Sequence, residues 1–217
     1  MYTPPCYDSE ARQTYPLLVL IHGSTFRDDQ WDRIGADETA DRLISTGEIP
    51  PLVILMPRDR VWRDPPEDMF DEALLEAILP WMEKNYHITS DRENRAVGGL
   101  SRGGAWAIHL GIRYPNVFGH IGAHSPTVFW SDTPDLRRLV RETPLDTLPR
   151  IYIDTGKNDF LIESAMWFEN MLTEEKIPHE WYLFNGRHEE AYWTAHMEDY
   201  LRWYSQGWVF DLLHEFD

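Results

Sequence analysis

The stretch AVGGLSRGGAW, residues 96–106, places Ser101 between two pairs of glycines, after a short apolar run and before a helical pattern. Glycine is used where the backbone must turn sharply or where another group must approach closely. Gly99, Ser101 and Gly103 match the pattern G-x-S-x-G. Between a strand and a helix, this pattern predicts a sharp turn that presents the serine as a nucleophile. The alternative is a tight turn that carries an inert serine.

Apolar runs recur on both sides of this stretch and predict strands at 16–22, 50–56, 94–99, 119–125, 150–155 and 180–185. The first two are continuous runs of valine, isoleucine and leucine, apart from their flanking residues. Such runs are expected of parallel strands that are buried on both faces.

Helical spacing separates the apolar runs, at 31–50, 65–86, 103–115, 160–177 and 190–208. Asp64 is expected to start the second of these helices, and Pro80 is expected to disturb it. Strands that alternate with helices predict an α/β fold. We expect a mostly parallel sheet of about six to seven strands, flanked by helices.

The length of 217 residues suits one domain with a full apolar core, so we expect residues 1–217 to form a single domain. Cys6 is the only cysteine, so no disulfide can form within the chain. The first residues lack the basic and apolar pattern of a signal peptide. We therefore expect a cytoplasmic protein, with a domain of a larger secreted enzyme as the alternative.

The net charge is −17, from 20 basic and 37 acidic side chains. Phosphate backbones and anionic membranes repel such a surface, so we expect neither nucleic acid nor a membrane as partner. The sequence also contains no apolar run long enough to cross a bilayer. A small molecule is the expected partner.

A serine nucleophile needs a base, usually a histidine that is held by a carboxylate. In α/β-hydrolases these residues follow one another in the order serine, acid, histidine. His188 fits the base, because it lies in a glycine-containing loop directly after the run 180–185, where it can reach back over the sheet. His196 lies farther into the last helix and is expected to be structural.

Asp154 and Asp159 are the two candidates for the acid. Asp154 lies at a strand end, where aspartates often serve as hydrogen-bonding turn residues. Asp159 lies in the loop beyond, from which a carboxylate can bend toward a histidine. We therefore favour Asp159.

Two backbone amides are expected to hold the negative oxygen that forms during attack on a carbonyl. One is the amide of Arg102, next to the nucleophile. The other comes from the loop after the first strand, where Gly23 allows close approach and Ser24 or Thr25 offers the amide. The Arg102 side chain is expected to form a salt bridge, with contact to substrate as the alternative.

Four segments together carry a resemblance to a known family: YTPPCYD with YPLLVLIHG, GGLSRGGAWAIHLGIRYPNVFGHIGAHSP, IDTGKNDF and NGRHEEAYW. The chain resembles the esterase D-like (putative esterase) family of α/β-hydrolases, which includes feruloyl, acetylxylan and siderophore esterases and S-formylglutathione hydrolases. The resemblance implies the α/β-hydrolase fold, a triad of Ser101, Asp159 and His188, and neither cofactor nor metal. Because family members carry further strands before YTPPxYD, it also implies a sheet that lacks part of the N-terminal hairpin.

The expected reaction is hydrolysis of a carboxylic ester through an acyl-enzyme. Transfer of the acyl group, hydrolysis of an amide, and a non-catalytic binding domain are the alternatives. A sheet that lacks its first hairpin leaves an edge that can pair with another chain. We expect either a homodimer or an edge that residues 1–15 shield.

Aromatic side chains are expected to rim the cleft at the carboxyl ends of the strands. They come from the loops after several strands: Phe26, Trp62, Trp130 and Trp193 as substrate-binding residues, with Phe129 and Tyr192 beside them. Flat aromatic walls suit short or aromatic acyl groups. The alternative is that these side chains only pack the loops.

Overall fold

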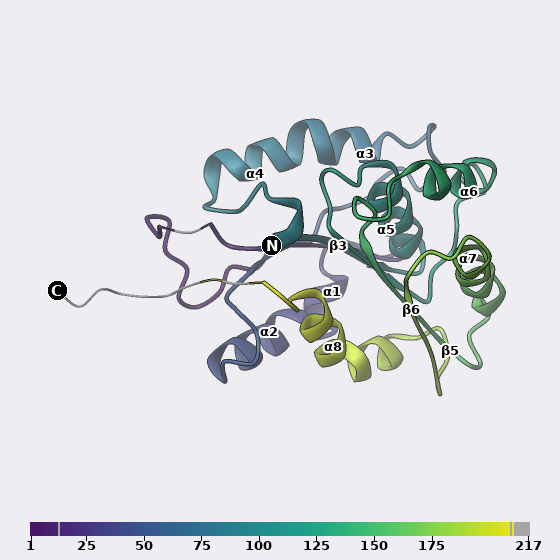
Figure 1. Cartoon of the computed structure of the whole chain (residues 1–217). Helices are drawn as coiled ribbons and strands as arrows, with labels where there is room; N and C mark the ends of the chain where they lie inside the picture. The colour runs from purple at the N-terminus through teal and green to yellow at the C-terminus, as the bar shows by residue number, and fades with distance from the viewer. Residues whose placement is uncertain (13, 209, 211–217) are drawn as a thin grey trace.

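The computed structural model describes residues 1–12, 14–208 and 210. A single six-stranded sheet lies at its centre, in the order β2-β1-β3-β4-β5-β6. Every neighbouring pair is parallel, and helices cover both faces (Figure 1). The strands are β1 Leu17–Ile21, β2 Val53–Leu55, β3 Arg95–Leu100, β4 His120–His124, β5 Arg150–Gly156 and β6 Glu180–Phe184. The expected parallel α/β sheet is confirmed.

The helices are α1 Gln30–Arg33, α2 Ala36–Ser45, α3 Phe70–Glu72, α4 Leu79–Asn85, α5 Arg102–Arg113, α6 Thr133–Glu142, α7 Ile162–Glu174 and α8 Glu190–Tyr204. A π-helical stretch, Ala73–Ile78, joins α3 to α4, and a 3₁₀ turn, Arg92–Asn94, precedes β3. Pro80 stands in the first turn of α4, directly after the π-helical stretch. The local disturbance expected at this proline is confirmed.

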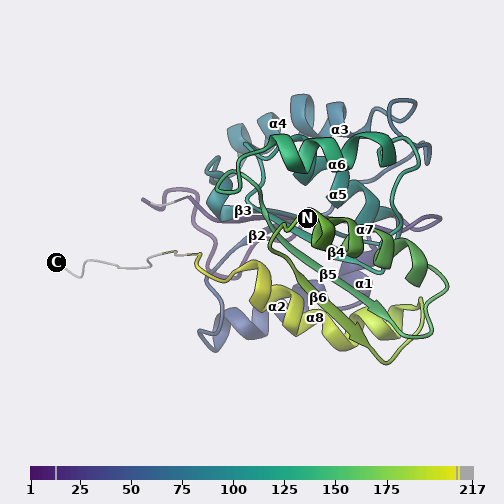
Figure 2. The ribbon, with the colours of Figure 1, turned by 45° about the vertical axis from the view of Figure 1, so that its right-hand side comes forward.

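Two apolar cores lie on the two faces of the sheet. Helices α3 to α7 bury one of them, around Trp106 and Phe168. Helices α1, α2 and α8 bury the other, around Trp31 and Leu201. Figure 2 shows α2 and α8 together on one face, with α3, α4 and α6 on the opposite one. The turn that holds Ser101 lies between these layers, where β3 passes into α5.

One helix was predicted with the wrong start, and another was missed. The helix expected from residue 65 begins only at Phe70, because Asp64 and Asp68 bind other groups: Asp64 accepts from the amide of Trp130, and Asp68 from Arg102. Helix α6 was not predicted at all. Arginines and acidic residues make up half of its sequence, TPDLRRLVRE, and only Leu136 and Val140 are buried.

The free edge of β2 is partly covered by the start of the chain. The Tyr2 amide donates to the Ile54 carbonyl at 2.8 Å, and the Ile54 amide donates to the Tyr2 carbonyl at 3.0 Å. This is the shielding expected as the alternative to a dimer. Strand β6 forms the opposite edge, and a homodimer stays a prediction. Among the described helices, none is long and apolar enough to cross a membrane.

Candidate active site

Ser101 stands between the last residue of β3 and the first of α5, with φ 57° and ψ −118°. A positive φ is strained for a serine and occurs most often at functional sites. A Cβ on Gly99 would lie 2.2 Å from the Gly103 carbonyl carbon, and one on Gly103 would lie 2.0 Å from the Ile21 oxygen. The sharp turn is therefore confirmed, and it requires glycine at both positions.

The outer two glycines serve other close approaches. A Cβ on Gly104 would lie 2.8 Å from Cβ of Pro126, and one on Gly98 would lie 1.8 Å from the Tyr204 hydroxyl. Gly104 thus lets α5 pack against the loop after β4. Gly98 leaves room for the hydroxyl group of Tyr204, which belongs to α8.

Asp159 and His188 meet at the carboxyl end of the sheet, from the loops after β5 and β6. Nδ1 of His188 lies 3.0 Å from each carboxylate oxygen of Asp159. The Leu161 amide donates to the same carboxylate at 2.7 Å. Burial alone would raise the pKa of Asp159, but the bonds from His188 and Leu161 outweigh it and hold the pKa below its ordinary value. The structure therefore pairs His188 with the acid that we favoured.

Asp154 takes no part in this pair. Its carboxylate is fully buried and binds His124 and two tyrosines of α8. His196 stacks on Phe184 with ring centroids 4.3 Å apart, as a packing residue of α8.

With Nδ1 of His188 bound to Asp159, Nε2 is the ring nitrogen that can accept a proton from a hydroxyl. The Ser101 hydroxyl makes no hydrogen bond with any described residue. Bonds between nucleophile and base are often loose until substrate binds. The arrangement can support general base catalysis once a substrate orders the serine.

The loop after β1 lies directly against the nucleophile. A Cβ on Gly23 would lie 3.5 Å from Cβ of Ser101. The amides of Ser24 and Thr25 have no hydrogen-bond partner among the described residues. His22 braces this loop, since Nδ1 binds the Gly23 carbonyl at 2.8 Å and Nε2 accepts from the Asp59 amide at 3.1 Å.

The Arg102 side chain forms the expected salt bridge and is buried. Its Nε donates to Asp59 at 2.7 Å, and its Nη2 donates to Asp68 at 3.0 Å and to the Arg63 carbonyl. The guanidinium also lies over the Phe129 ring, 5.0 Å from the centroid. Arg102 therefore fastens the loop 59–68 to the nucleophile turn.

Arg102→Met is expected to destabilise the fold by about 3–5 kcal/mol, because it leaves Asp59 and Asp68 buried without their cation. Urea unfolding followed by circular dichroism measures this effect. The matched control is Arg138→Met, since Arg138 pairs with exposed carboxylates on α6. Equal midpoints for the two variants would contradict the role given to Arg102.

The aromatic residues expected around the cleft fall into two groups. Phe26, Trp62 and Trp130 are exposed, at 37%, 47% and 83%. Phe129, Tyr192 and Trp193 are buried, which agrees with the alternative that such side chains pack the loops. Trp193 packs edge-on against His188, with ring centroids 5.0 Å apart, and so supports the histidine from beneath.

Phe160 is an aromatic neighbour of the site that the sequence analysis missed. It is 76% exposed, and its ring centroid lies 4.5 Å from that of His188. Its place directly after Asp159 was the available signal, because a residue beside a catalytic acid on a loop end is close to the substrate.

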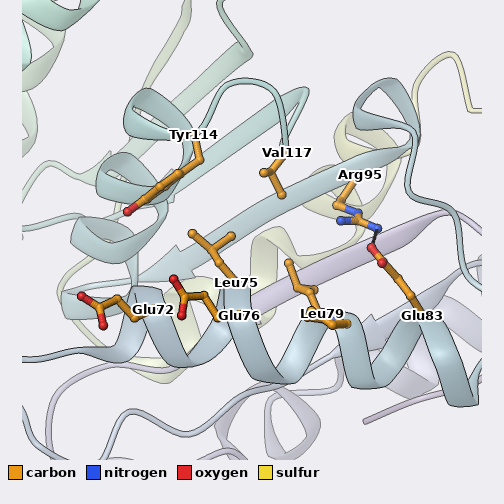
Figure 3. Close-up of a pocket in the computed structure, with 9 residues that line it drawn as sticks. Glu72, Leu75, Glu76, Leu79, Glu83, Arg95, Tyr114 and Val117 are labelled. Carbon is orange, nitrogen blue, oxygen red and sulfur yellow. Dashed lines mark hydrogen bonds and ion pairs between the residues drawn. The ribbon is translucent and has the colours of Figure 1, made fainter.

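A separate hollow of about 340 Å³ lies at the opposite end of the sheet, where β3 begins. Figure 3 shows Leu75, Leu79 and Val117 facing into it, and Glu83 reaching Arg95 at its edge. Its lining contains no serine, cysteine or histidine. It therefore lacks the residue types of a serine–histidine or cysteine–histidine site.

Comparison with known families gives one match over nearly the whole described chain. A family model described as putative esterase matches residues 1–204. Among curated relatives, an endo-1,4-beta-xylanase/feruloyl esterase of Xylanibacter ruminicola is 30% identical over 120 residues, which cover 51% of this chain and 16% of that protein. The chain spans only 16% and 33% of the first two curated relatives that it matches.

Solved structures share the fold. A ferulic acid esterase superposes with a TM-score of 0.79 at 23% identity, covering 89% of this chain and 86% of the other. An S-formylglutathione hydrolase from Staphylococcus aureus superposes with a TM-score of 0.72 at 18% identity, covering 89% and 82%. These similarities establish the α/β-hydrolase fold for the sheet and its helices.

Proposed function

Because the chain belongs to the putative esterase family, we propose that it hydrolyses carboxylic esters with Ser101 as nucleophile, His188 as base and Asp159 as the acid that holds the base. The observation that carries the proposal is the Asp159–His188 pair, at 3.0 Å, at the same end of the sheet as a strained serine. Relatives named esterase support the reaction class.

In the proposed mechanism, Ser101 Oγ attacks the ester carbonyl while His188 Nε2 takes its proton. The amides of Arg102 and Ser24 donate to the oxygen that becomes negative. The tetrahedral intermediate collapses, the C–O bond to the alcohol breaks, and His188 returns the proton to the leaving alcohol. Water, activated by the same histidine, then releases the acid from Ser101.

Labelling with a fluorophosphonate tests this assignment. We expect one label per chain, on Ser101, together with hydrolysis of p-nitrophenyl acetate. A protein that neither takes the label nor hydrolyses the ester would be a non-catalytic domain. Product analysis with and without added alcohol separates hydrolysis from acyl transfer.

We propose short or aromatic acyl esters as substrates. The exposed rings of Trp62, Trp130 and Phe160 offer flat apolar surfaces with few mobile carbons. A curated relative named feruloyl esterase and a solved ferulic acid esterase support an aromatic acyl group.

Acetyl and butyryl esters are expected to be hydrolysed readily, and esters beyond about eight to ten acyl carbons poorly. Burying an added methylene of the acyl chain against an apolar surface contributes about 0.8 kcal/mol. Flat rings offer little apolar surface to the carbons beyond a short chain, so longer acyl groups gain little from binding. A series of p-nitrophenyl esters measures kcat/KM against chain length. Rates that climb steadily to the palmitoyl ester would rule out this substrate class.

A further inference from the structure

Asp154 is the centre of a buried hydrogen-bond cluster that the proposed reaction does not use. Its carboxylate binds Nδ1 of His124 at 2.6 Å and accepts from the hydroxyls of Tyr192 at 2.6 Å and Tyr200 at 2.8 Å. On the other side of the imidazole, Nε2 of His124 binds the Tyr204 hydroxyl at 2.8 Å. All five side chains are at most 4% exposed.

The sheet is shaped around this cluster. A Cβ on Gly122 would lie 1.7 Å from the Tyr204 hydroxyl, and one on Gly98 would lie 1.8 Å from it. Glycines at adjacent positions of β3 and β4 therefore open the space through which Tyr204 reaches His124. Any larger side chain at either position would displace the tyrosine.

One assignment of protons satisfies every polar group in the cluster. Tyr192, Tyr200 and the Nδ1–H of His124 donate to the Asp154 carboxylate. Tyr204 donates to Nε2 of His124. A buried charge is tolerated when it is hydrogen-bonded in this way, and breaking a single bond leaves a costly unpaired group. Burial and the nearby Asp154 carboxylate raise the pKa of Tyr192 and Tyr200, which keeps both hydroxyls as donors.

The cluster reaches the proposed base through helix α8. All three tyrosines belong to this helix, which begins two residues after His188. A Cβ on Gly186, in the His188 loop, would lie 2.4 Å from the Tyr192 ring. The next residue, Trp193, packs against the His188 ring. Tyr192 therefore packs against the loop that carries His188, and it precedes Trp193, which contacts the His188 ring.

The cluster also reaches the nucleophile. The Ser101 amide donates to the backbone carbonyl of His124 at 2.9 Å. His124 is thus fixed by its side chain to Asp154 and by its carbonyl to the nucleophile turn. Figure 2 shows α8 beside α2 on one face of the sheet, and α8 packs against β4.

We propose that Asp154, His124, Tyr192, Tyr200 and Tyr204 form a positioning network that fixes α8, and with it the imidazole of His188, relative to Ser101. The apolar face of α8 packs in the core on this side of the sheet, and the hydrogen bonds of this network add directional contacts at defined distances. The inference rests on the proposed function, because it assigns the network a role in setting the base against the nucleophile. Tyr192 is the positioning residue nearest to His188.

Tyr192→Phe tests the proposal, because it removes one hydroxyl and keeps the ring. A base displaced by about 1 Å can cost about a hundredfold in rate. We expect kcat for p-nitrophenyl acetate to fall by about tenfold to a hundredfold, with KM within about twofold of the original. The matched control is Tyr182→Phe, which removes an exposed hydroxyl that donates to Glu180 on β6. The control should keep full activity.

A network that only adds stability would lower the melting temperature of Tyr192→Phe and leave kcat unchanged below that temperature. That result would overturn the proposal. If Tyr192→Phe does not fold, Tyr200→Phe replaces it, since its hydroxyl binds the same carboxylate from two turns farther along α8.

A readout without activity separates this inference from the proposed function. In proton NMR, the Nδ1–H of His188 should give a downfield signal, identified by its absence in His188→Ala. We expect this signal to shift or broaden in Tyr192→Phe and to stay unchanged in Tyr182→Phe. A wild-type protein without esterase activity would refute the proposed function, whereas an unchanged signal in Tyr192→Phe would refute the positioning network.

Discussion

Ser101→Ala is expected to reduce ester turnover by on the order of 10⁶-fold, the size of loss that follows removal of a triad nucleophile. The reason is that no other hydroxyl can take its place at the turn. The alternative nucleophile, water, must attack without forming an acyl-enzyme. Folding should be almost unaffected, because Gly99 and Gly103 keep the turn and alanine meets the same backbone strain as serine.

Hydrolysis of p-nitrophenyl acetate and fluorophosphonate labelling measure the effect, with unfolding followed by circular dichroism as the check on structure. Ser131→Ala is the matched control, because Ser131 is a half-buried serine in the loop before α6. Turnover near that of the wild type in a clean preparation of Ser101→Ala would remove Ser101 from the mechanism.

His188→Ala is expected to be about as damaging as Ser101→Ala, because the members of a triad act as a unit. The double variant should be little worse than either single one. Asp159→Asn is expected to cost on the order of 10⁴-fold in kcat, since an amide favours the wrong tautomer of the imidazole. His179→Ala is the control, as a half-buried histidine before β6 whose Nδ1 binds the Ile177 carbonyl.

Asp154→Asn should be milder than Asp159→Asn, because Asp154 acts on the base only through α8. The opposite order would show that the acid is assigned to the wrong aspartate. Steady-state kinetics of the two variants, measured side by side with a melting curve for each, decide between them.

The rate is expected to fall toward acid pH, because a histidine must be neutral to accept a proton from the serine hydroxyl. Asp159 does not cause this fall. Burial raises its pKa, but the hydrogen bonds from His188 and Leu161 outweigh burial and hold the pKa below its ordinary value. A pH–rate profile of kcat/KM measures the effect. A flat profile from pH 5 to pH 8 would count against a histidine base.

The elements around the site could be predicted because local signals agree there. G-x-S-x-G, the apolar run before it and the helical pattern after it each specify the same turn, and Ser101 indeed adopts it. The choice of Asp159 over Asp154 followed from loop position, and the structure pairs Asp159 with His188. In each case the pattern within one segment of the sequence was sufficient to make the prediction.

The errors occur where distant segments decide the outcome. Asp64 resembles a helix start in sequence, but it binds the Trp130 amide, 66 residues away. Trp193 follows the histidine and was expected at the rim, yet packing against His188 buries it. Tyr204 joins His124 across 80 residues, and no periodicity could indicate that contact. Burial and long-range hydrogen bonds require the assembled sheet.

Arg102 performs two tasks at once, and this limits how the protein can be altered. Its amide is proposed to hold the oxyanion, while its side chain fastens the loop 59–68 that carries Trp62. Changing that loop to accept a bulkier substrate would also disturb the contacts of Arg102, the residue next to Ser101. Substrate range and turnover are therefore expected to change together in directed evolution. Variants that accept a wider range of acyl groups should arise first at Trp130 or Phe160. Their side chains are exposed and do not take part in the Arg102 contacts.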